Sequence, residues 1–325
     1  MANSLQLDGS VLLPKRTGFF SRAWRQKFLL LMMIPGVLYF LIFRYIPMYG
    51  IIIAFKDFDF AYGISGSPWV GMQHFVSMWN NDYFWQTVSN TIKISILQLT
   101  TGFCFPILLA LLLNELRAKR YKRVVQTISY MPHFLSWVVV SGLIFQLLSN
   151  QYGFYGYINN LFNRSNPTVI MQTEGGFMAT ILVSNIWKGI GYGSILYLAR
   201  ITGISPELYE SAVIDGAGRF KQCIYITIPQ IAPTIAVMLV LAMGGLLDGS
   251  FEQIYNLRNP IITPAFETID TYVLDLTGLA GRTVGGARPQ YSFSTAVNLS
   301  RSVIALGLVM SCNWIAGKVF NYTVF

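Results

Sequence analysis

The sequence contains few side chains whose types and spacing suit catalysis or metal binding. Its two histidines, His74 and His133, lie far apart and near no pair of cysteines, and the three cysteines, Cys104, Cys223 and Cys312, are scattered. This spacing fits neither a metal site, nor a disulfide framework, nor a nucleophile with its base. We therefore expect a chain without catalytic residues or a bound metal, whose function depends on binding and movement.

Glycine-rich stretches are present, but they do not match a nucleotide-binding loop. The nearest match to the phosphate-binding pattern Gly-x-x-x-x-Gly-Lys-Ser/Thr is Gly317-Lys318-Val319, which lacks both the hydroxyl and the leading glycine. The run from Gly189 to Gly193 lacks the preceding strand and the third-glycine spacing of a dinucleotide fingerprint. We expect its glycines to allow close packing or bending of a helix, and we expect the chain to bind no cofactor of its own.

The elements that must position any functional side chain are membrane-spanning helices. Of the 325 residues, 54% are hydrophobic and only 11% are charged, whereas about 25% are charged in an ordinary soluble domain. A spanning helix needs about 20 mostly apolar residues, and segments of this kind recur along the chain. We predict an all-α polytopic membrane protein with six spans, at 28–43 with a possible continuation to 55, at 94–114, within 124–148, at 177–199, within 222–247 and at 294–317.

The formal net charge of +9 lies on one side of the membrane in this arrangement. If the spans alternate in direction, the connections on one side together hold 14 cations and five acids, and the rest of the chain holds nine of each. The positive-inside rule places the basic side in the cytoplasm, together with both termini. The charge therefore indicates topology and contact with anionic lipid, and it does not support nucleic-acid binding.

The first 27 residues form a basic segment that we assign to the cytoplasm. The apolar segment that follows has no small-residue cleavage site and is apolar on all its faces. This predicts a retained spanning helix instead of a cleaved signal peptide or a helix lying on the membrane surface. We therefore divide the chain into a cytoplasmic segment, 1–27, and a transmembrane domain, 28–325. The long outer connection 248–293 is expected to fold as an external cap or to re-enter the membrane.

The cytoplasmic connection between predicted spans four and five has the strongest local pattern. Ser205-Pro206-Glu207 predicts a helix start with a hydroxyl cap, a proline at the first position and a carboxylate in the first turn. Asp215-Gly216-Ala217-Gly218 ends this helix, because glycine accepts turn geometry that other residues resist. A second short helix then leads from Arg219 into span five. We expect this helix–turn–helix to dock a soluble partner and to tilt both spans when it moves.

This segment resembles the signature loop of the membrane subunits of binding-protein-dependent ABC importers. That loop reads Glu-Ala-Ala, three residues, Gly, nine residues and Ile-x-Leu-Pro, and here Glu210-Ser211-Ala212, Gly216 and Ile226-Thr227-Ile228-Pro229 occupy these positions. Ser211 and Ile228 depart from the pattern by residues of similar size. The resemblance implies that the loop at 201–230 docks on an ATPase subunit, with Glu210 pairing to a basic residue there. The other docking residues that it implies are Tyr209, Ser211, Ala212, Asp215, Gly216 and Ala217.

Other segments resemble the oligosaccharide and polysaccharide branch of these permeases, and within that branch the chain is most similar to alginate importers. The resemblance implies a maltose-importer-like permease fold in the cytoplasmic (inner) membrane of a bacterium. It also implies a homologous second permease subunit, two ATPase subunits that bind ATP and magnesium, and an extracytoplasmic solute-binding protein that delivers an oligo- or polysaccharide. The segments that carry this resemblance are 47–58, 251–257, 270–273 and 291–296.

Two cations, Lys188 and Arg301, lie inside predicted spans, where each costs about 2.5–3.5 kcal/mol at the bilayer centre. One interpretation is that they line an aqueous cavity for a hydroxyl-rich or anionic sugar. The other is that Lys188 reaches the outer interface and that Arg301 pairs with Asp248 or Glu252. The sequence leaves both open. The candidate residues of the substrate path are Gln98, Gln146, Asn185, Trp187, Lys188, Tyr192, Asn298 and Arg301.

An alternative function is that of a secondary transporter or channel that no ATPase drives. Such proteins typically contain inverted repeats with broken helices and acidic residues within their spans. The sequence shows no such repeat, and its acidic residues lie outside the predicted spans. A membrane-embedded enzyme is also disfavoured, because no nucleophile and base converge. The sequence therefore favours a non-catalytic permease subunit.

Overall fold

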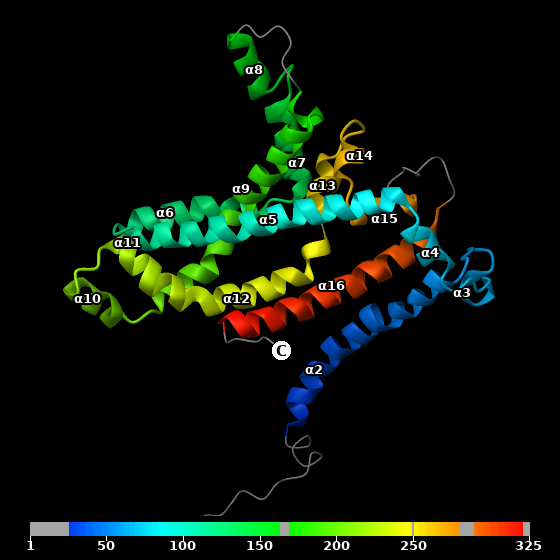
Figure 1. The fold of residues 1–325 in the computed structure, drawn as a ribbon, viewed down its shortest axis with the longest axis horizontal. Helices are drawn as coiled ribbons and strands as arrows, with labels where there is room; N and C mark the ends of the chain where they lie inside the picture. Colours follow the sequence, from blue (N-terminus) through cyan, green and yellow to red (C-terminus); the bar gives the residue numbers. More distant parts are fainter. Residues whose placement is uncertain (1–25, 163–168, 249, 280–288, 321–325) are drawn as a thin grey trace, which may run out of the picture. The chain divides into compact units, whose positions relative to one another are not determined.

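The computed structural model describes residues 26–162, 169–248, 250–279 and 289–320, and the regular structure in these ranges is helical (Figure 1). The strand-like pairing found there is an isolated antiparallel bridge between Lys56 and Trp69. The chain separates into two compact units, residues 1–52 and 53–325. The all-α class is therefore confirmed.

The first unit contains an uninterrupted series of helical turns. Helix α2 (Lys27–Phe40) passes into a π-helical turn (Leu41–Tyr45) and then into a 3-10 helix (Ile46–Phe55), whose last residues belong to the second unit. No side chain of α2 is buried, which suits a helix surrounded by lipid. The whole stretch is long and apolar enough to cross a membrane, so the first predicted span continues past Arg44. The predicted cytoplasmic segment before it lies almost wholly outside the described residues.

Four long helices form the framework of the second unit. Helix α5 packs along α9, α9 also contacts α12, and α12 packs along α16 (Figure 1). The Asn81 side chain accepts hydrogen bonds from two backbone N–H groups at the start of α5 and thereby caps that helix. The four helices are α5 (Asp82–Glu115), α9 (Glu174–Thr202), α12 (Ile228–Gly244) and α16 (Tyr291–Phe320).

The third predicted span is not one straight helix. Helix α6 (Lys119–Tyr130) and a 3-10 turn (Met131–Phe134) are followed by α7 (Trp137–Leu148), and the chain bends by 101° between them. The Ser136 hydroxyl accepts a hydrogen bond from the Val139 N–H at 3.4 Å, which starts α7. The third span was predicted within 124–148, and α7 ends at Leu148 as expected, whereas the break at Ser136, where a new helix begins in a new direction, was not predicted.

Four helical stretches of the described residues are long and apolar enough to cross a membrane, and the bent pair of α6 and α7 adds a fifth if it forms one span. Helix α9 lies where the fourth span was predicted, but it is not among them. The total of six spans therefore stays a prediction, as does the cytoplasmic position of the termini. The four stretches are Lys27–Phe55, Asp82–Glu115, Arg219–Gly244 and Tyr291–Ile315.

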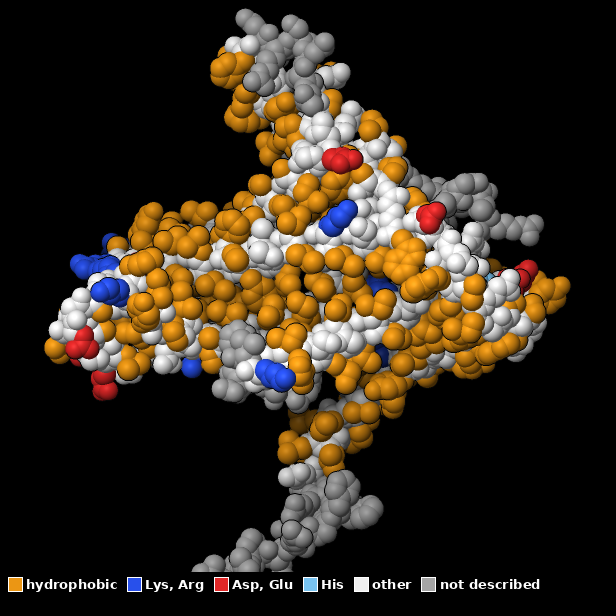
Figure 2. All heavy atoms as spheres, viewed as in Figure 1, with side chains coloured by type: hydrophobic (Ala, Val, Ile, Leu, Met, Phe, Trp, Pro, Cys, Tyr) orange, Lys and Arg blue, Asp and Glu red, His pale blue; other side chains and the backbone are white. Residues whose placement is uncertain are grey.

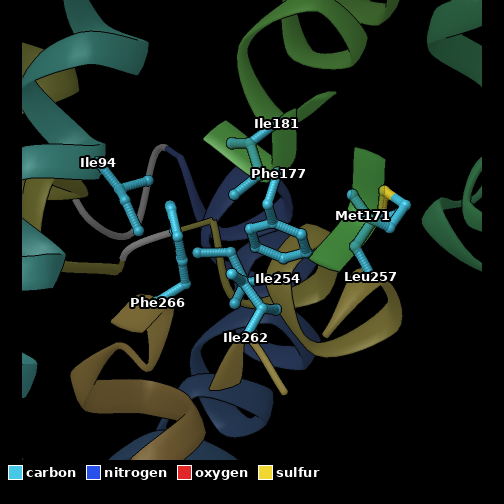
Figure 3. Close-up of a cluster of buried hydrophobic side chains, with 8 residues drawn as sticks. All are labelled: Ile94, Met171, Phe177, Ile181, Ile254, Leu257, Ile262 and Phe266. Atoms are coloured by element: carbon cyan, nitrogen blue, oxygen red, sulfur yellow. The ribbon is translucent and has the colours of Figure 1, made fainter. Parts of the chain in front are cut away.

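Short helices at one end of the bundle arise from the long connection that was expected to fold as a cap. They are α13 (Phe251–Leu257), α14 (Thr263–Phe266) and α15 (Ile269–Leu276), and we call residues 250–277 the cap. An apolar cluster, shown in Figure 3, joins the cap to α5 and α9. Its members are Ile94, Met171, Phe177, Ile181, Ile254, Leu257, Ile262 and Phe266. Other short helices are α3 (Gly63–Gly66), α4 (Gln73–Trp79) and α8 (Phe154–Leu161).

Candidate docking element and polar clusters

The segment between α9 and α12 forms a helix as predicted, although its first turn is closed differently. Helix α10 (Pro206–Ile214) has proline at its first position, but the Ser205 hydroxyl makes no capping hydrogen bond. The Ser205 backbone carbonyl instead accepts from the Leu208 N–H at 3.2 Å. The expected hydroxyl cap is wrong because the backbone alone closes this turn.

A left-handed glycine ends α10, as predicted. Gly216 has φ +75°, a region that side-chain-bearing L-residues rarely adopt. Its N–H donates to the Val213 carbonyl at 3.0 Å, and the Ala217 N–H donates to the Ala212 carbonyl at 2.8 Å. Helix α11 (Arg219–Gln222) follows and leads through a π-helical turn into α12. We call residues 205–222 the α10–α11 element.

The α10–α11 element presents carboxylates and large apolar side chains on its surface. Ile214 is 86% exposed and Phe220 is 78% exposed. The Glu210 carboxylate is exposed and pairs with no cation among the described residues. Tyr209 points inward, since its hydroxyl lies 2.9 Å from the Thr227 hydroxyl at the base of α12. Of the other predicted docking residues, Ser211, Asp215 and Gly216 are exposed, and Ala212 and Ala217 are half-buried.

The flanks of this element are held against the end of α5. Arg219 forms an ion pair with Glu115 at 2.7 Å, and both side chains border a cavity of about 300 Å³ that Tyr209 and Arg117 also line. An apolar cluster lies beside them and combines residues of α5, α9 and α12. Its members are Ala110, Leu113, Tyr197, Leu198, Ile201 and Ile231.

Lys188 lies at the break between α6 and α7. Its ammonium donates to the His133 backbone carbonyl at 2.9 Å and sits 5.4 Å from the centre of the Trp137 ring. Tyr192, one turn further along α9, stacks on the His133 ring at 3.9 Å between centroids. A helix break frees backbone carbonyls, and in lipid these need a partner from within the protein. Lys188 supplies that partner.

Arg301 forms ion pairs with two carboxylates, Asp248 and Asp270. The predicted pairing with Asp248 is therefore present, Glu252 is not a partner, and Asp270 was not foreseen. Burial raises the pKa of Asp270 to about 6, against the opposing effect of the Arg301 charge. The Arg301 side chain of α16 thus joins the cap to the segment at the end of α12.

Gln98 is buried, with its amide hydrogen-bonded to other side chains. Its amide nitrogen donates to the Gln253 amide oxygen at 2.9 Å, and its own oxygen accepts from the Ser250 hydroxyl. Gln253 is fully buried. Sequence reasoning missed Gln253, because its partner lies 155 residues away and no local pattern connects the two.

The predicted path residues do not converge on one place. Gln146 and Trp187 line the same cavity, of about 740 Å³, between α7, α8 and α9, and its wall is mostly apolar. Asn185 and Asn298 are half-buried on α9 and α16. Lys188 and Tyr192 meet at the helix break, whereas Gln98 and Arg301 belong to separate polar clusters. Their role in a substrate path stays a prediction.

A third polar cluster, which the sequence did not reveal, lies within the cap. Arg258 and Asp275 form a bidentate ion pair with both distances at 2.9 Å, and each side chain is only 7% exposed. Glu267 is also buried and accepts a hydrogen bond from the Tyr83 hydroxyl at the start of α5. Burial raises the pKa of Glu267. These contacts fix the cap on the end of α5.

Comparison with known proteins shows the family. The model of a family described as "Binding-protein-dependent transport system inner membrane component" matches residues 102–311. The chain belongs to this family, and its place is the inner membrane. The resemblance drawn from the loop motif is confirmed.

Relatives and solved structures agree with this assignment. The polygalacturonan/rhamnogalacturonan transport system permease protein YteP of Bacillus subtilis (strain 168) is 40% identical over 304 residues, 94% of this chain and 92% of YteP. Protein LplB of the same organism is 40% identical over 296 residues, 90% of each chain. A crystal structure of a bacterial alginate ABC transporter, in complex with alginate pentasaccharide-bound periplasmic protein, contains a chain that matches with a TM-score of 0.83 and 36% identity. That match covers 94% of this chain and 99% of the other. The ABC permease fold is thus shown.

Proposed function

We propose that the chain is one of two permease subunits of an ATP-driven importer for an oligosaccharide or polysaccharide. The observation that carries the proposal is the α10–α11 element, in which a helix, a left-handed glycine and a second helix stand between two long helices. Membership in the binding-protein-dependent family supports it. In this proposal the element docks on an ATPase subunit, and a homologous second permease completes the pathway.

The surface of the element suits a protein partner. The exposed carboxylate of Glu210 offers an ion pair to a basic residue, and the exposed side chains of Ile214 and Phe220 offer apolar area. Large apolar side chains exposed beside charged groups suit a protein interface. The turn at Gly216 sets the angle between the two helices, so it determines whether both can contact the partner together.

The distribution of charge supports a cytoplasmic position for this element. Exposed cations gather at the end of the bundle where α6 begins and α11 lies, and Figure 2 shows this group beside a largely hydrophobic surface. The positive-inside rule assigns that end to the cytoplasm and the cap to the outside. We include in the proposal six spans, both termini inside, and a cytoplasmic segment 1–27 before the transmembrane domain 28–325. The exposed cations are Arg117, Lys119, Arg120, Arg123, Arg219 and Lys221.

The chain contributes docking and movement, and the catalysis belongs to its partners. ATP and magnesium bind the two ATPase subunits, because this sequence has no phosphate-binding loop. When the ATPases close, they move the α10–α11 element. Since its ends continue into α9 and α12, both helices tilt together. A solute-binding protein loaded with sugar docks on the side of the cap and releases the sugar into the pathway.

The names of the relatives support a sugar substrate, and alginate is one candidate. YteP is named for polygalacturonan/rhamnogalacturonan transport, and the solved transporter imports alginate. The two cations in the predicted spans do not themselves indicate an anionic sugar. Lys188 is engaged by a backbone carbonyl, and Arg301 is engaged by two carboxylates. The cavity beside Gln146 and Trp187 is the part of the predicted path that offers both an amide and an aromatic ring.

Docking is tested by Glu210→Arg and Gly216→Pro. The first reverses the charge offered to the partner. The second imposes a φ near −65° where the chain has +75° and removes an N–H that donates to Val213. We expect both variants to lose co-purification with the ATPase subunits and ATP hydrolysis stimulated by the loaded binding protein. Glu174→Arg, a change at an exposed carboxylate at the other end of α9, is the matched control and should retain co-purification with the ATPase subunits. Unchanged co-purification in the two loop variants contradicts the proposal.

Reconstitution in proteoliposomes separates the remaining alternatives. Uptake that needs neither ATP nor a second protein would identify a secondary transporter or channel. With the complete complex, ATP hydrolysis stimulated by binding protein loaded with anionic oligosaccharides is compared with that stimulated by neutral ones. The class of oligosaccharide that gives the larger stimulation of ATP hydrolysis is the substrate class. If neither class stimulates ATP hydrolysis, a role in sugar import is contradicted.

A further inference from the structure

Gln253 joins one helix of the cap to two long helices at once. Its side chain is 0% exposed. The amide nitrogen donates to the Ile181 carbonyl at 2.7 Å and to the Ser184 hydroxyl at 2.9 Å, both on α9. The amide oxygen accepts from the Gln98 amide on α5 at 2.9 Å. Both polar atoms of the Gln253 side chain therefore hold α13 against α5 and α9.

Gln98 extends this contact to the start of α13. Its amide oxygen accepts a hydrogen bond from the Ser250 hydroxyl. Ser250 precedes α13 and has φ +49°, a conformation that a serine adopts only where its surroundings hold it. Buried amides that are hydrogen-bonded to one another favour a single arrangement of their helices, because a displacement leaves a buried polar group without a hydrogen-bond partner. The network, which we define as Gln98, Gln253, Ser184 and Ser250, therefore fixes the position of α13.

The same two long helices reach the α10–α11 element at their other end. Helix α9 continues directly into the element, and α5 packs along α9. With 34 residues, α5 extends over about 50 Å. The apolar cluster that contains Leu113, Leu198 and Ile231 fixes α5, α9 and α12 together where the element begins and ends. One packed pair of helices thus has the cap at one end and the flanks of the element at the other.

We propose that Gln98 and Gln253 are positioning residues that couple movement of the cap to movement of the α10–α11 element. The inference rests on the proposed function, in which the cap lies on the side of the binding protein and the element on that of the ATPase. A displacement of α13 by the docked binding protein carries α5 and α9 with it, because the network ties the three helices. Without the network, the apolar cluster that contains Ile94, Ile181 and Ile254 still packs α13 against α5 and α9. The directional contacts that fix the position of α13 are lost, so less of the cap's movement reaches the element.

The test uses the complete transporter in proteoliposomes, with the partner permease, the ATPase subunits and binding protein loaded with the transported sugar. The double variant Gln98→Leu/Gln253→Leu replaces both amides by apolar groups of similar volume, which avoids the cost of one amide left without a partner. Gln73→Leu, the same change at an exposed position of α4, is the matched control. The measurements are assembly, melting temperature, basal ATP hydrolysis, its stimulation by loaded binding protein, and sugar imported per ATP.

We expect the double variant to assemble and to keep its melting temperature and basal hydrolysis. Stimulation by loaded binding protein and sugar imported per ATP should each fall by roughly fivefold or more, a change typical of lost coupling between sites. The control should keep both. Ser184→Ala removes one of the two acceptors of the Gln253 amide and should lower stimulation in the same direction by a smaller factor. If the double variant does not assemble, the Ser184→Ala variant provides the test of coupling.

The inference is contradicted if the double variant keeps the wild-type stimulation of ATP hydrolysis and the wild-type amount of sugar imported per ATP. If only Ser184→Ala assembles, wild-type stimulation of ATP hydrolysis in that variant contradicts the inference. A failure of the proposed function looks different. In that case the unmodified complex itself shows no ATP-dependent uptake, whereas the coupling inference is tested only against an unmodified complex that transports.

Discussion

At the scale of single residues, Arg301 shows how a cation is accommodated inside a predicted span. Two carboxylates, Asp248 and Asp270, surround one guanidinium, so the cluster has a net negative charge when both are ionised. Asp248 remains largely exposed, with 60% of its side chain accessible, whereas Asp270 is mostly buried at 16%. Burial is therefore the main cause of the raised pKa of Asp270. The charge of this cluster therefore changes near pH 6.

The Asp270 carboxyl predicts a pH dependence of stability. Its pKa rises from 3.8 to about 6 in the folded chain, so the folded state binds the proton more tightly than the unfolded state. Its contribution to stability is present below pH 3.8 and is lost as the pH rises through 6, by at most about 1.4 kcal/mol per pH unit. We expect Asp270→Asn to flatten the change in melting temperature between pH 7 and pH 5. Identical pH profiles for both proteins in detergent contradict this.

The polar contacts differ in how far the sequence could predict them. The pairing of Arg301 with Asp248 was part of one of the two interpretations that the sequence left open, because a cation in an apolar segment requires an anion and Asp248 follows the neighbouring span. Asp270 was not foreseen, since it lies beyond two short helices whose fold decides where it points. The contact of Lys188 with the His133 carbonyl depends on a helix break that had not been predicted. When tertiary packing decides which residues form an ion pair or hydrogen bond, no local pattern in the sequence predicts the contact.

At the scale of elements, the break between α6 and α7 is the largest departure from the predicted helices. The sequence did contain its signals: Pro132 and a serine that caps the next helix, Ser136. An uncharged run hides such signals, because hydropathy alone does not distinguish one span from two shorter helices. The α10–α11 element was predicted well for the opposite reason. Its proline, glycine and carboxylate act on adjacent backbone, so the pattern is local.

The glycines of α9 give a prediction at this scale. A Cβ on Gly191 would lie 2.0 Å from the Ser129 carbonyl oxygen of α6, whereas a Cβ on Gly189 meets nothing within 4 Å. We expect Gly191→Ala to lower the free energy of unfolding by about 1–3 kcal/mol, because the two backbones must separate. Gly189→Ala should raise it by about 0.5–1 kcal/mol, since alanine favours the helix. Denaturant unfolding of both variants in detergent checks this, and equal effects contradict close packing at Gly191.

At the scale of the whole molecule, charge and hydropathy predicted the class of protein before any contact was known. The long apolar segments are local properties of the sequence, and most of them coincide with helices of the structure. The arrangement of those helices was not predictable, because apolar faces are similar to one another. The contacts that fix it involve residues up to 234 positions apart, as in the hydrogen bond from the Phe58 N–H to the Ser292 hydroxyl.

The orientation of the molecule in the membrane is tested by cysteine labelling. Tyr152 is 93% exposed in the turn before α8, and Ile214 is 86% exposed at the end of α10. With Cys104, Cys223 and Cys312 replaced by serine, we expect a membrane-impermeant maleimide to label Tyr152→Cys in right-side-out vesicles and Ile214→Cys in inside-out vesicles that lack the ATPase subunits. Labelling of both positions from the same side contradicts the proposed topology.

The ion pairs of Arg301 also bear on how the chain is made. Both of its partners precede it in the sequence, Asp248 by 53 residues and Asp270 by 31, so they are synthesised before it. A helix carrying an arginine enters a membrane at a cost of about 2.5–3.5 kcal/mol when the charge is at its centre. The carboxylates of Asp248 and Asp270 offset this cost where they pair with Arg301. If the chain inserts in the order of its synthesis, α16 enters the membrane beside segments that already supply both counterions for Arg301.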